Sequence, residues 1–178
     1  MSHSLYPTVI LPVRRNLQDT HYDCGPASLA IILETLGRHY TEETLMKWGH
    51  TTPQDGTTPE MLDHILNKIE VRHEIFPHAS IGLVEQEIRN FNLCLIDYQA
   101  WADGGSEIEE VESGHYSVIF GFNETHFYLA DPAKRHTKVD KEWGFRTIGK
   151  DLFAKRWYEQ EENGEKTYHW MMSVPLVQ

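Results

Sequence analysis

The order of helix-like and strand-like segments predicts an α+β fold for this chain of 178 residues. In the first half, apolar residues recur at helical spacing, and in the second half they gather in short runs rich in β-branched and aromatic side chains. No repeat, low-complexity tract or linker divides the chain. Because a domain typically has about 150 residues, residues 1–178 are expected to form one domain, with a helical N-terminal half and an antiparallel β-sheet in the C-terminal half.

Helices are predicted at four places in the first half. In the first, over about 25–36, Leu29, Ile32 and Leu33 lie on one face, Pro26 suits the first turn and Gly37 the C-terminal stop. Thr41, and Thr58 followed by Pro59, are expected to begin two further helices. The other predicted helices cover residues 42–48, 59–69 and 81–91.

Strands are predicted where the periodicity changes, over 93–98, 115–122 and 125–131, with Asn123 and Glu124 turning a hairpin between the last two. The acidic, Gly-rich stretch from Asp103 to Gly114 is expected to be a mobile surface loop that could cover a site next to it. A late helix over 151–158 and a last strand over 168–174 complete the expected elements.

Charge and hydropathy exclude several functional classes. Sixteen Lys and Arg residues against 27 Asp and Glu residues give a net charge of −11, which disfavours binding to nucleic acid or to an anionic membrane. No run of about 18 apolar residues could span a membrane, and the first 15 residues do not resemble a signal peptide. We therefore expect a cytoplasmic protein, with export by a non-Sec route left open.

The two cysteines differ in their surroundings, so no disulfide is expected between them. Cys94 lies in an apolar run and should belong to the core. Cys24 immediately precedes the first predicted helix, where unpaired backbone N–H groups and the helix dipole favour a thiolate. Asp23 is expected to cap the same helix through its side chain. A histidine close to Cys24 would provide the proton shuttle for acyl transfer.

Among 11 histidines, His115 is the best candidate for that role. It opens an apolar strand directly after Gly114, whereas most others, such as those at positions 39, 50, 64 and 73, are expected on exposed faces or loops. Asp131 closes the next strand. If the two strands pair as a hairpin, this carboxylate lies beside His115 and can fix its tautomer.

These residues also carry a family resemblance. The block Gln18-x5-Cys24-Gly25-Pro26-Ala27, followed by Gly114-His115-Tyr116 and Ala130-Asp131-Pro132, resembles the bacteriocin-processing cysteine peptidases of the papain-like superfamily. In the better-known members, the peptidase is the N-terminal domain of an ABC exporter and cuts leader peptides after a double glycine. The resemblance spans about residues 8–135. No GxxxxGK[ST] phosphate loop accompanies it.

The resemblance implies a papain-like fold with Cys24 as nucleophile, His115 as general base and then acid, and Asp131 as the residue that orients His115. It further implies that the side-chain amide of Gln18 and the backbone N–H of Cys24 stabilise the oxyanion of the tetrahedral intermediate. The expected function is therefore that of a cysteine peptidase cleaving peptide or isopeptide bonds, with a peptide or protein substrate.

Two alternatives remain open at this point. The same triad could transfer the acyl group to an amine, or the chain could be an inactive member that only binds peptides. No cofactor is expected. No metal is expected either, because the zinc signatures HExxH and CxxC are absent. Four of the five tryptophans, Trp101, Trp143, Trp157 and Trp170, could line a substrate site or fill the core. The oligomeric state is left open.

Overall fold

The computed structural model describes residues 7–100, 114–133, 144–160 and 164–178. Helices predominate in its first half and strands in its second half, and every pairing between the described strands is antiparallel. The elements are β1 (Val9–Ile10), α1 (Cys24–Thr35), α2 (Glu42–Gly49), α3 (Pro59–Lys68), β2 (Glu74–Phe76), α4 (Ile81–Arg89), β3 (Asn92–Tyr98), β4 (His115–Phe122), β5 (His126–Ala130), β6 (Phe145–Gly149), α5 (Lys150–Arg156), β7 (Tyr158–Gln160), β8 (Lys166–Tyr168) and β9 (Met171–Pro175).

The main sheet has the strand order β2-β9-β3-β4-β5-β6, and β1 pairs with the end of β4. β3 and β4 lie at its centre, and each is buried over almost its whole length. Such strands read as continuous apolar runs because both faces of the sheet are covered. β7 and β8 form a separate two-stranded ribbon.

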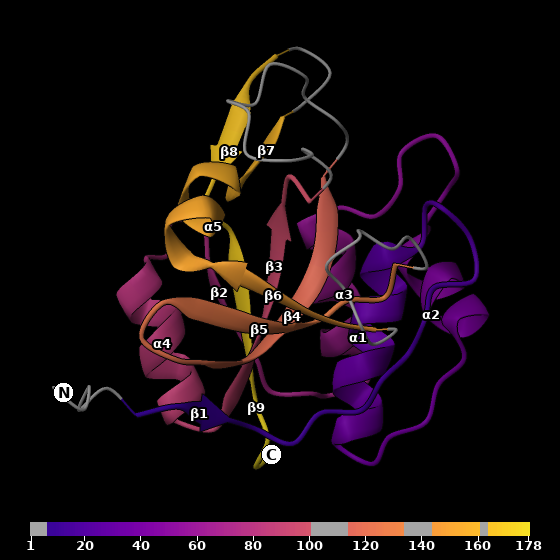
Figure 1. Cartoon of the computed structure of the whole chain (residues 1–178). Helices are drawn as coiled ribbons and strands as arrows, with labels where there is room; N and C mark the ends of the chain where they lie inside the picture. The colour runs from indigo at the N-terminus through magenta and orange to yellow at the C-terminus, as the bar shows by residue number, and fades with distance from the viewer. Residues whose placement is uncertain (1–6, 101–113, 134–143, 161–163) are drawn as a thin grey trace, which may run out of the picture.

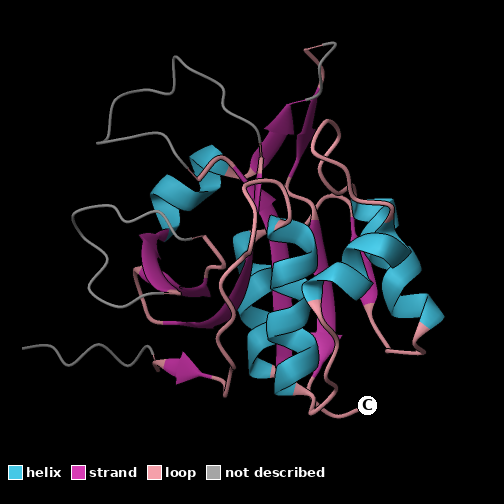
Figure 2. Cartoon of the chain, turned by 90° about the vertical axis from the view of Figure 1, so that its right-hand side faces the viewer, coloured by secondary structure: helices cyan, strands magenta, loops and turns pink. Residues whose placement is uncertain are grey.

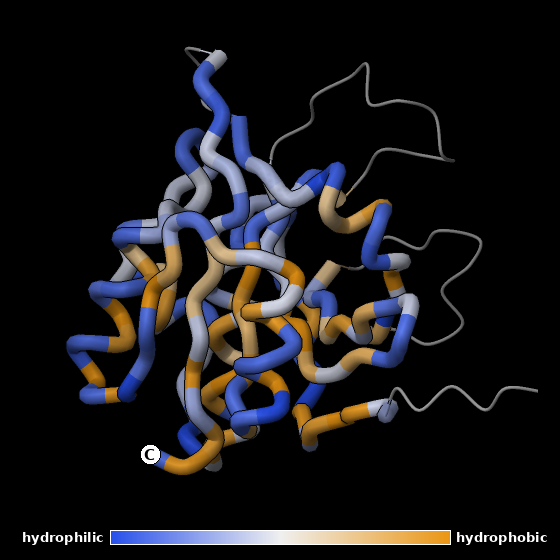
Figure 3. The backbone as a smooth tube through the Cα atoms, turned by 90° about the vertical axis from the view of Figure 1, so that its left-hand side faces the viewer, coloured by the Kyte–Doolittle hydropathy of each residue, from blue (hydrophilic) through white to orange (hydrophobic). Residues whose placement is uncertain are grey.

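Helices cover the two faces of the main sheet (Figures 1 and 2). α1, α2 and α3 lie on one side, with α1 packed along β4, and α4 lies on the other side against β3. The core between these layers is formed by aliphatic residues of α1, α3, α4 and the central strands. Figure 3 shows the hydrophobic positions gathered in this region, whereas the β7–β8 end is mostly hydrophilic.

The helix starts follow from their capping residues. The hydroxyls of Thr41, Thr58 and Ser80 each accept a hydrogen bond from a backbone N–H in the first turn of α2, α3 and α4, respectively. Gly37 adopts a φ of +74° just after α1, a conformation that favours glycine and ends the helix. These local signals explain why the helices lie where the sequence predicts them.

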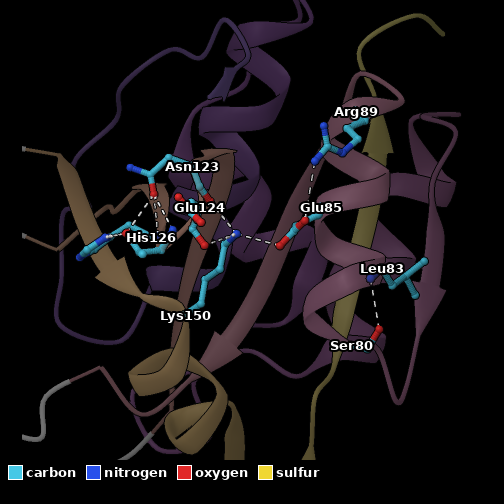
Figure 4. Close-up of polar contacts among 9 residues, drawn as sticks. Ser80, Leu83, Glu85, Arg89, Asn123, Glu124, His126 and Lys150 are labelled. Carbon is cyan, nitrogen blue, oxygen red and sulfur yellow. Dashed lines mark hydrogen bonds and ion pairs between the residues drawn. The ribbon is translucent and has the colours of Figure 1, made fainter. Parts of the chain in front are cut away.

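Lys150 connects three elements at one edge of the sheet (Figure 4). Its ammonium donates to Glu85 on α4 at 2.7 Å and to the backbone carbonyl of Asn123 in the β4–β5 turn at 2.6 Å. The side-chain oxygen of Asn123 accepts from the backbone N–H groups of Thr125 and His126. The predicted turn at 123–124 is therefore confirmed, and it fixes the register of the hairpin that carries His115.

Some expected boundaries were wrong. The predicted last strand over 168–174 corresponds to β9 and starts too early, because His169 adopts a φ of +63° and separates Tyr168, the end of β8, from β9. The late helix ends at Arg156, and Tyr158 starts β7. α4 ends before Phe91, which also has a positive φ. The short strands β1, β2, β6, β7 and β8 were not predicted.

In the part of the chain that the structure describes, no helix is long and apolar enough to cross a membrane. The predicted loop from Asp103 to Gly114 lies outside the described residues except for Gly114, as do Trp101 and Trp143. Trp157 and Trp170 belong to the core, and the indole N–H of Trp157 donates to the carbonyl of Trp170 at 2.9 Å.

Candidate active site

Cys24 lies at the start of α1, as the sequence predicts, although it is the first helical residue and does not precede the helix, and it is partly exposed. The first backbone hydrogen bond of the helix runs from Ala27 N–H to the carbonyl of Asp23 at 2.9 Å. The backbone N–H of Cys24 precedes this bond, so it belongs to the set of helix-start donors that have no intrahelical acceptor. Cys24 therefore provides both a thiol and an unpaired backbone N–H at the positive end of the α1 dipole.

The expected side-chain cap by Asp23 is wrong. Asp23 occupies the N-cap position, but its carboxylate makes no capping hydrogen bond. Instead, both of its oxygens accept from the backbone N–H of Thr20 at 3.2 Å, because the chain before the helix folds back over the buried side chain. Asp23 thus shapes the loop that leads into Cys24.

His115 and Asp131 lie side by side, as the hairpin predicts. β4 and β5 pair with Val118 opposite Ala130, which brings the start of one strand next to the end of the other. Nε2 of His115 lies 2.8 Å from Oδ1 of Asp131, and both side chains are almost fully buried. With Nε2 engaged in this way, Nδ1 is the ring nitrogen left to act on another group.

Asp131 is held by more than His115. Its Oδ1 also accepts from the backbone N–H of Ala133 at 2.8 Å, and its Oδ2 from Nη1 of Arg146 on β6 at 2.8 Å. Burial alone would raise the pKa of Asp131, but His115 and Arg146 outweigh it and hold the pKa well below its usual range. Asp131 is therefore a fixed negative charge.

This charge determines the protonation of His115. Burial acts to lower the pKa of His115, but the Asp131 carboxylate, and after it the Cys24 thiol, outweigh burial and raise the pKa to about 10. The side chain of Cys24 is thus a hydrogen-bonding and electrostatic neighbour of His115. Both neighbours therefore favour the protonated form of the imidazole beside the thiol.

Gln18 lies in the loop before α1 and is buried. Its Nε2 donates to the carbonyl of Thr20 at 2.6 Å, and its backbone N–H donates to the carbonyl of Pro132 at 2.8 Å, directly after Asp131. Because the carbonyl of Thr20 can only accept, the NH₂ group of the Gln18 side chain must face it. The second N–H of this NH₂ group can donate to another acceptor. The loop of Gln18 is therefore tied to the segment of Asp131.

Several residues around this site were missed by the sequence analysis. Arg146 contacts Asp131, Asp97 lies opposite Tyr116 in the β3–β4 register, and Glu159 approaches Gly114. Burial, and then the charge of Glu159, raise the pKa of Asp97 well above its usual range. The sequence analysis could not place them at the site, because β6 and β7 were not predicted and no pairing of β3 with β4 was predicted.

The remaining histidines follow the expectation in most cases. His39, His50 and His64 are exposed. His73 was wrongly expected to be exposed, since its side chain is largely buried and its Nε2 lies 2.7 Å from Asp63. Cys94 is fully buried in the core and, like Cys24, is a free cysteine. Among the described residues, no group of three or more His, Cys, Asp or Glu side chains is arranged to hold a metal ion.

Comparison with protein families identifies the kind of site. The model of the peptidase C39 family matches residues 13–148, which include all four candidate residues. The chain belongs to the peptidase C39 family. This C39 chain is 31% identical over 146 residues to an uncharacterized protein of Methanothermobacter thermautotrophicus, with 80% of the chain and 84% of the relative covered. A protein of Methanothermobacter marburgensis is 27% identical over 142 residues, with 78% of each covered.

Solved C39 structures share the fold. A C39-like peptidase from Bacillus anthracis, described as putative, superimposes with a TM-score of 0.66 at 15% identity, covering 94% of this chain and 97% of the other. The peptidase domain of Streptococcus ComA, a bifunctional ABC transporter, gives 0.61 at 18% identity, with 94% and 98% covered. A double-glycine-motif protease from an AMS/PCAT transporter, in complex with a leader peptide, gives 0.62 at 18% identity, with 97% and 99% covered.

These matches confirm the resemblance to bacteriocin-processing peptidases and the papain-like α+β fold. By its family, the C39 chain is a cysteine-type peptidase.

Proposed function

We propose that this chain hydrolyses peptide or isopeptide bonds with Cys24 as nucleophile, His115 as general acid and base, and Asp131 as the residue that orients His115. In this proposal, Gln18 and the backbone N–H of Cys24 form the oxyanion site. The leader-peptide complex of a related double-glycine-motif protease supports a peptide as the substrate class.

The observation that carries the proposal is the contact between His115 and Asp131. Nε2 of His115 lies 2.8 Å from a carboxylate that Arg146 and Ala133 hold in place, while Cys24 raises the pKa of the same imidazole. An imidazolium beside a thiol at a helix start favours a thiolate–imidazolium pair, which is the reactive form of a cysteine peptidase.

The proposed reaction begins when the Cys24 thiolate attacks the carbonyl carbon and forms a C–S bond. The carbonyl electron pair moves onto oxygen, where Gln18 and the Cys24 backbone N–H donate hydrogen bonds. Collapse of this intermediate breaks the C–N bond as Nδ1 of His115 gives its proton to the leaving amine. Water, deprotonated by His115, then attacks the thioester, releases the acid and restores the thiolate.

Gln18 suits the oxyanion role because its amide orientation is fixed. With Nε2 donating to Thr20, the amide cannot rotate without placing two carbonyl oxygens against each other. A fixed donor stabilises charge that develops in the transition state without reorganisation, and loss of one such donor typically costs about 2.7–4 kcal/mol of transition-state stabilisation.

The test is alkylation of Cys24 by iodoacetamide between pH 5 and 9 in the wild type and in His115→Ala, followed by mass spectrometry, with buried Cys94 as the internal control. We expect rapid labelling of Cys24 already near pH 6, and a loss of about tenfold or more at that pH in His115→Ala, because the thiolate loses its imidazolium partner. Incubation with a peptide mixture should also give cleavage products that disappear in Cys24→Ala.

Two results would contradict the proposal. One is slow labelling of Cys24 that does not respond to His115→Ala. The other is peptide cleavage that persists in Cys24→Ala. Ligated products with added amines, in place of hydrolysed ones, would assign the same triad to acyl transfer.

A further inference from the structure

Glu42 lies outside the proposed triad, yet it contacts the loop that carries Gln18. It is the first residue of α2 and is almost fully buried. Its Oε1 accepts from Nδ2 of Asn16 at 2.5 Å, and its Oε2 accepts from the backbone N–H of Asp19 at 3.0 Å. One carboxylate thus binds the loop on both sides of Gln18.

The other end of the loop is held by Asp23, which binds the backbone N–H of Thr20. Thr20 in turn provides the carbonyl that fixes the amide of Gln18. Glu42 and Asp23 therefore hold consecutive parts of one short segment from two different helix starts.

The two carboxyl groups are also close to each other. Burial, and to a smaller extent the neighbouring Asp23, raise the pKa of Glu42 to about 7. Burying two neighbouring acidic groups costs free energy unless hydrogen bonds offset it. Besides contacting each other, the two carboxyl groups accept hydrogen bonds from Asn16, Asp19 and Thr20, all in the Asn16–Thr20 segment.

We propose that Glu42 is a positioning residue for the oxyanion site, which keeps the Asn16–Thr20 loop in the conformation that directs an N–H of Gln18 at the substrate carbonyl. The inference rests on the proposed function, since it assigns Gln18 to the oxyanion. In the part of the chain that the structure describes, the Glu42 carboxylate contacts Asn16, Asp19 and Asp23, not the Cys24 thiol or the His115 imidazole. Its effect should therefore be confined to the step in which the oxyanion forms.

The experiment compares Glu42→Ala, Glu42→Gln and the control Glu43→Ala by hydrolysis of a peptide that the wild type cleaves and by iodoacetamide labelling of Cys24. Alkylation by iodoacetamide forms no oxyanion, so it reports the thiolate alone. In Glu42→Ala we expect kcat to fall about tenfold or more, with KM within about twofold and labelling near the wild-type rate, because a small displacement of one donor is sufficient for such a loss.

Glu42→Gln should recover most of kcat, because glutamine keeps the shape and an acceptor oxygen and the Asn16 amide can turn to match it. Glu43→Ala removes the same charge from the exposed neighbour on α2 and should change neither rate. Asn16→Ala removes only one of the two loop contacts, so it replaces Glu42→Ala if that variant does not fold, with the same expected separation of kcat from labelling.

Three results would overturn the inference: an unchanged kcat in folded Glu42→Ala, labelling that falls as much as kcat, or a Glu42→Gln variant as slow as Glu42→Ala. Failure of the proposed function itself looks different, because the wild type would then show no hydrolysis that depends on Cys24.

Discussion

At the scale of single residues, Gly114 shows how closely the site is packed. A Cβ at this position would lie 1.6 Å from Oε2 of Glu159 and 2.5 Å from Oδ1 of Asp97. Because His115 follows directly, any side chain at 114 would move either the carboxylates or the start of β4. The absence of a side chain at 114 thus allows acidic groups from β3 and β7 to lie beside the imidazole.

We therefore expect Gly114→Ala to lower the free energy of unfolding by about 1–3 kcal/mol through overpacking and to slow the labelling of Cys24. Adding Glu159→Ala removes the group that collides first and should restore a large part of both losses. The measurement is a double-mutant cycle by urea denaturation and alkylation. Strictly additive effects of the two substitutions would show that Glu159 is not the group displaced.

The sequence could place single residues in the fold where the signal was local. Cys24 could be chosen because it precedes a helix, and His115 and Asp131 because a short turn pairs their strands. Gln18 came only from the family resemblance, since nothing in its own surroundings distinguishes it. Glu42 was placed in its helix but not in the site, because its role depends on how α2 packs beside the loop before α1.

At the scale of elements, long periodic segments were predicted and short strands were not. α1 to α4, β3, β4 and β5 carry apolar stripes or runs within one segment. β2 has three residues and pairs with β9, and β6 is joined to β5 by a long connection. The stability of such strands comes from partners that are distant in the sequence, so their own residues carry little signal.

The contact between α1 and β4 connects the nucleophile to the histidine. The hydroxyl of Ser28, one turn into α1 and fully buried, donates to the carbonyl of Tyr116 at 3.1 Å. Tyr116 follows His115 directly. This hydrogen bond therefore fixes the start of the helix against the start of the strand.

Ser28→Ala should lower the free energy of unfolding by about 1 kcal/mol, the usual loss for one hydrogen bond, and should also reduce the labelling rate of Cys24 because the thiol and imidazole are no longer held in register. Thr35→Ala is the matched control. It removes a hydroxyl that donates to the carbonyl of Ile31 and accepts from Arg14 at the far end of α1, so it should cost stability alone. If Cys24 were labelled at the same rate in Ser28→Ala and Thr35→Ala, the role given to Ser28 would be contradicted.

At the scale of the whole molecule, the buried charges fix how stability depends on pH. Asp131 has a lowered pKa, so its contribution is present above its ordinary value of 3.8 and is lost as the pH falls below it. His115, with a pKa raised from 6.5 to about 10, contributes fully below about pH 6.5 and loses that contribution as the pH rises to 10. Glu42 acts in the same direction between its ordinary value of 4.5 and about 7, because the folded state binds its proton more tightly.

These contributions together predict a maximum of stability near pH 5 and a steady decline toward pH 10, measured as the free energy of unfolding in urea at each pH. The net charge of −11 at pH 7 adds repulsion in the same direction.

The variant Glu42→Gln isolates the contribution of Glu42 to this pH dependence. Its stability relative to the wild type should rise between pH 5 and 8, since glutamine takes up and releases no proton. A difference that stays constant over this range would mean that Glu42 titrates alike in the folded and unfolded chains, and that its contacts with Asn16 and Asp19 are those of an ordinary surface carboxylate.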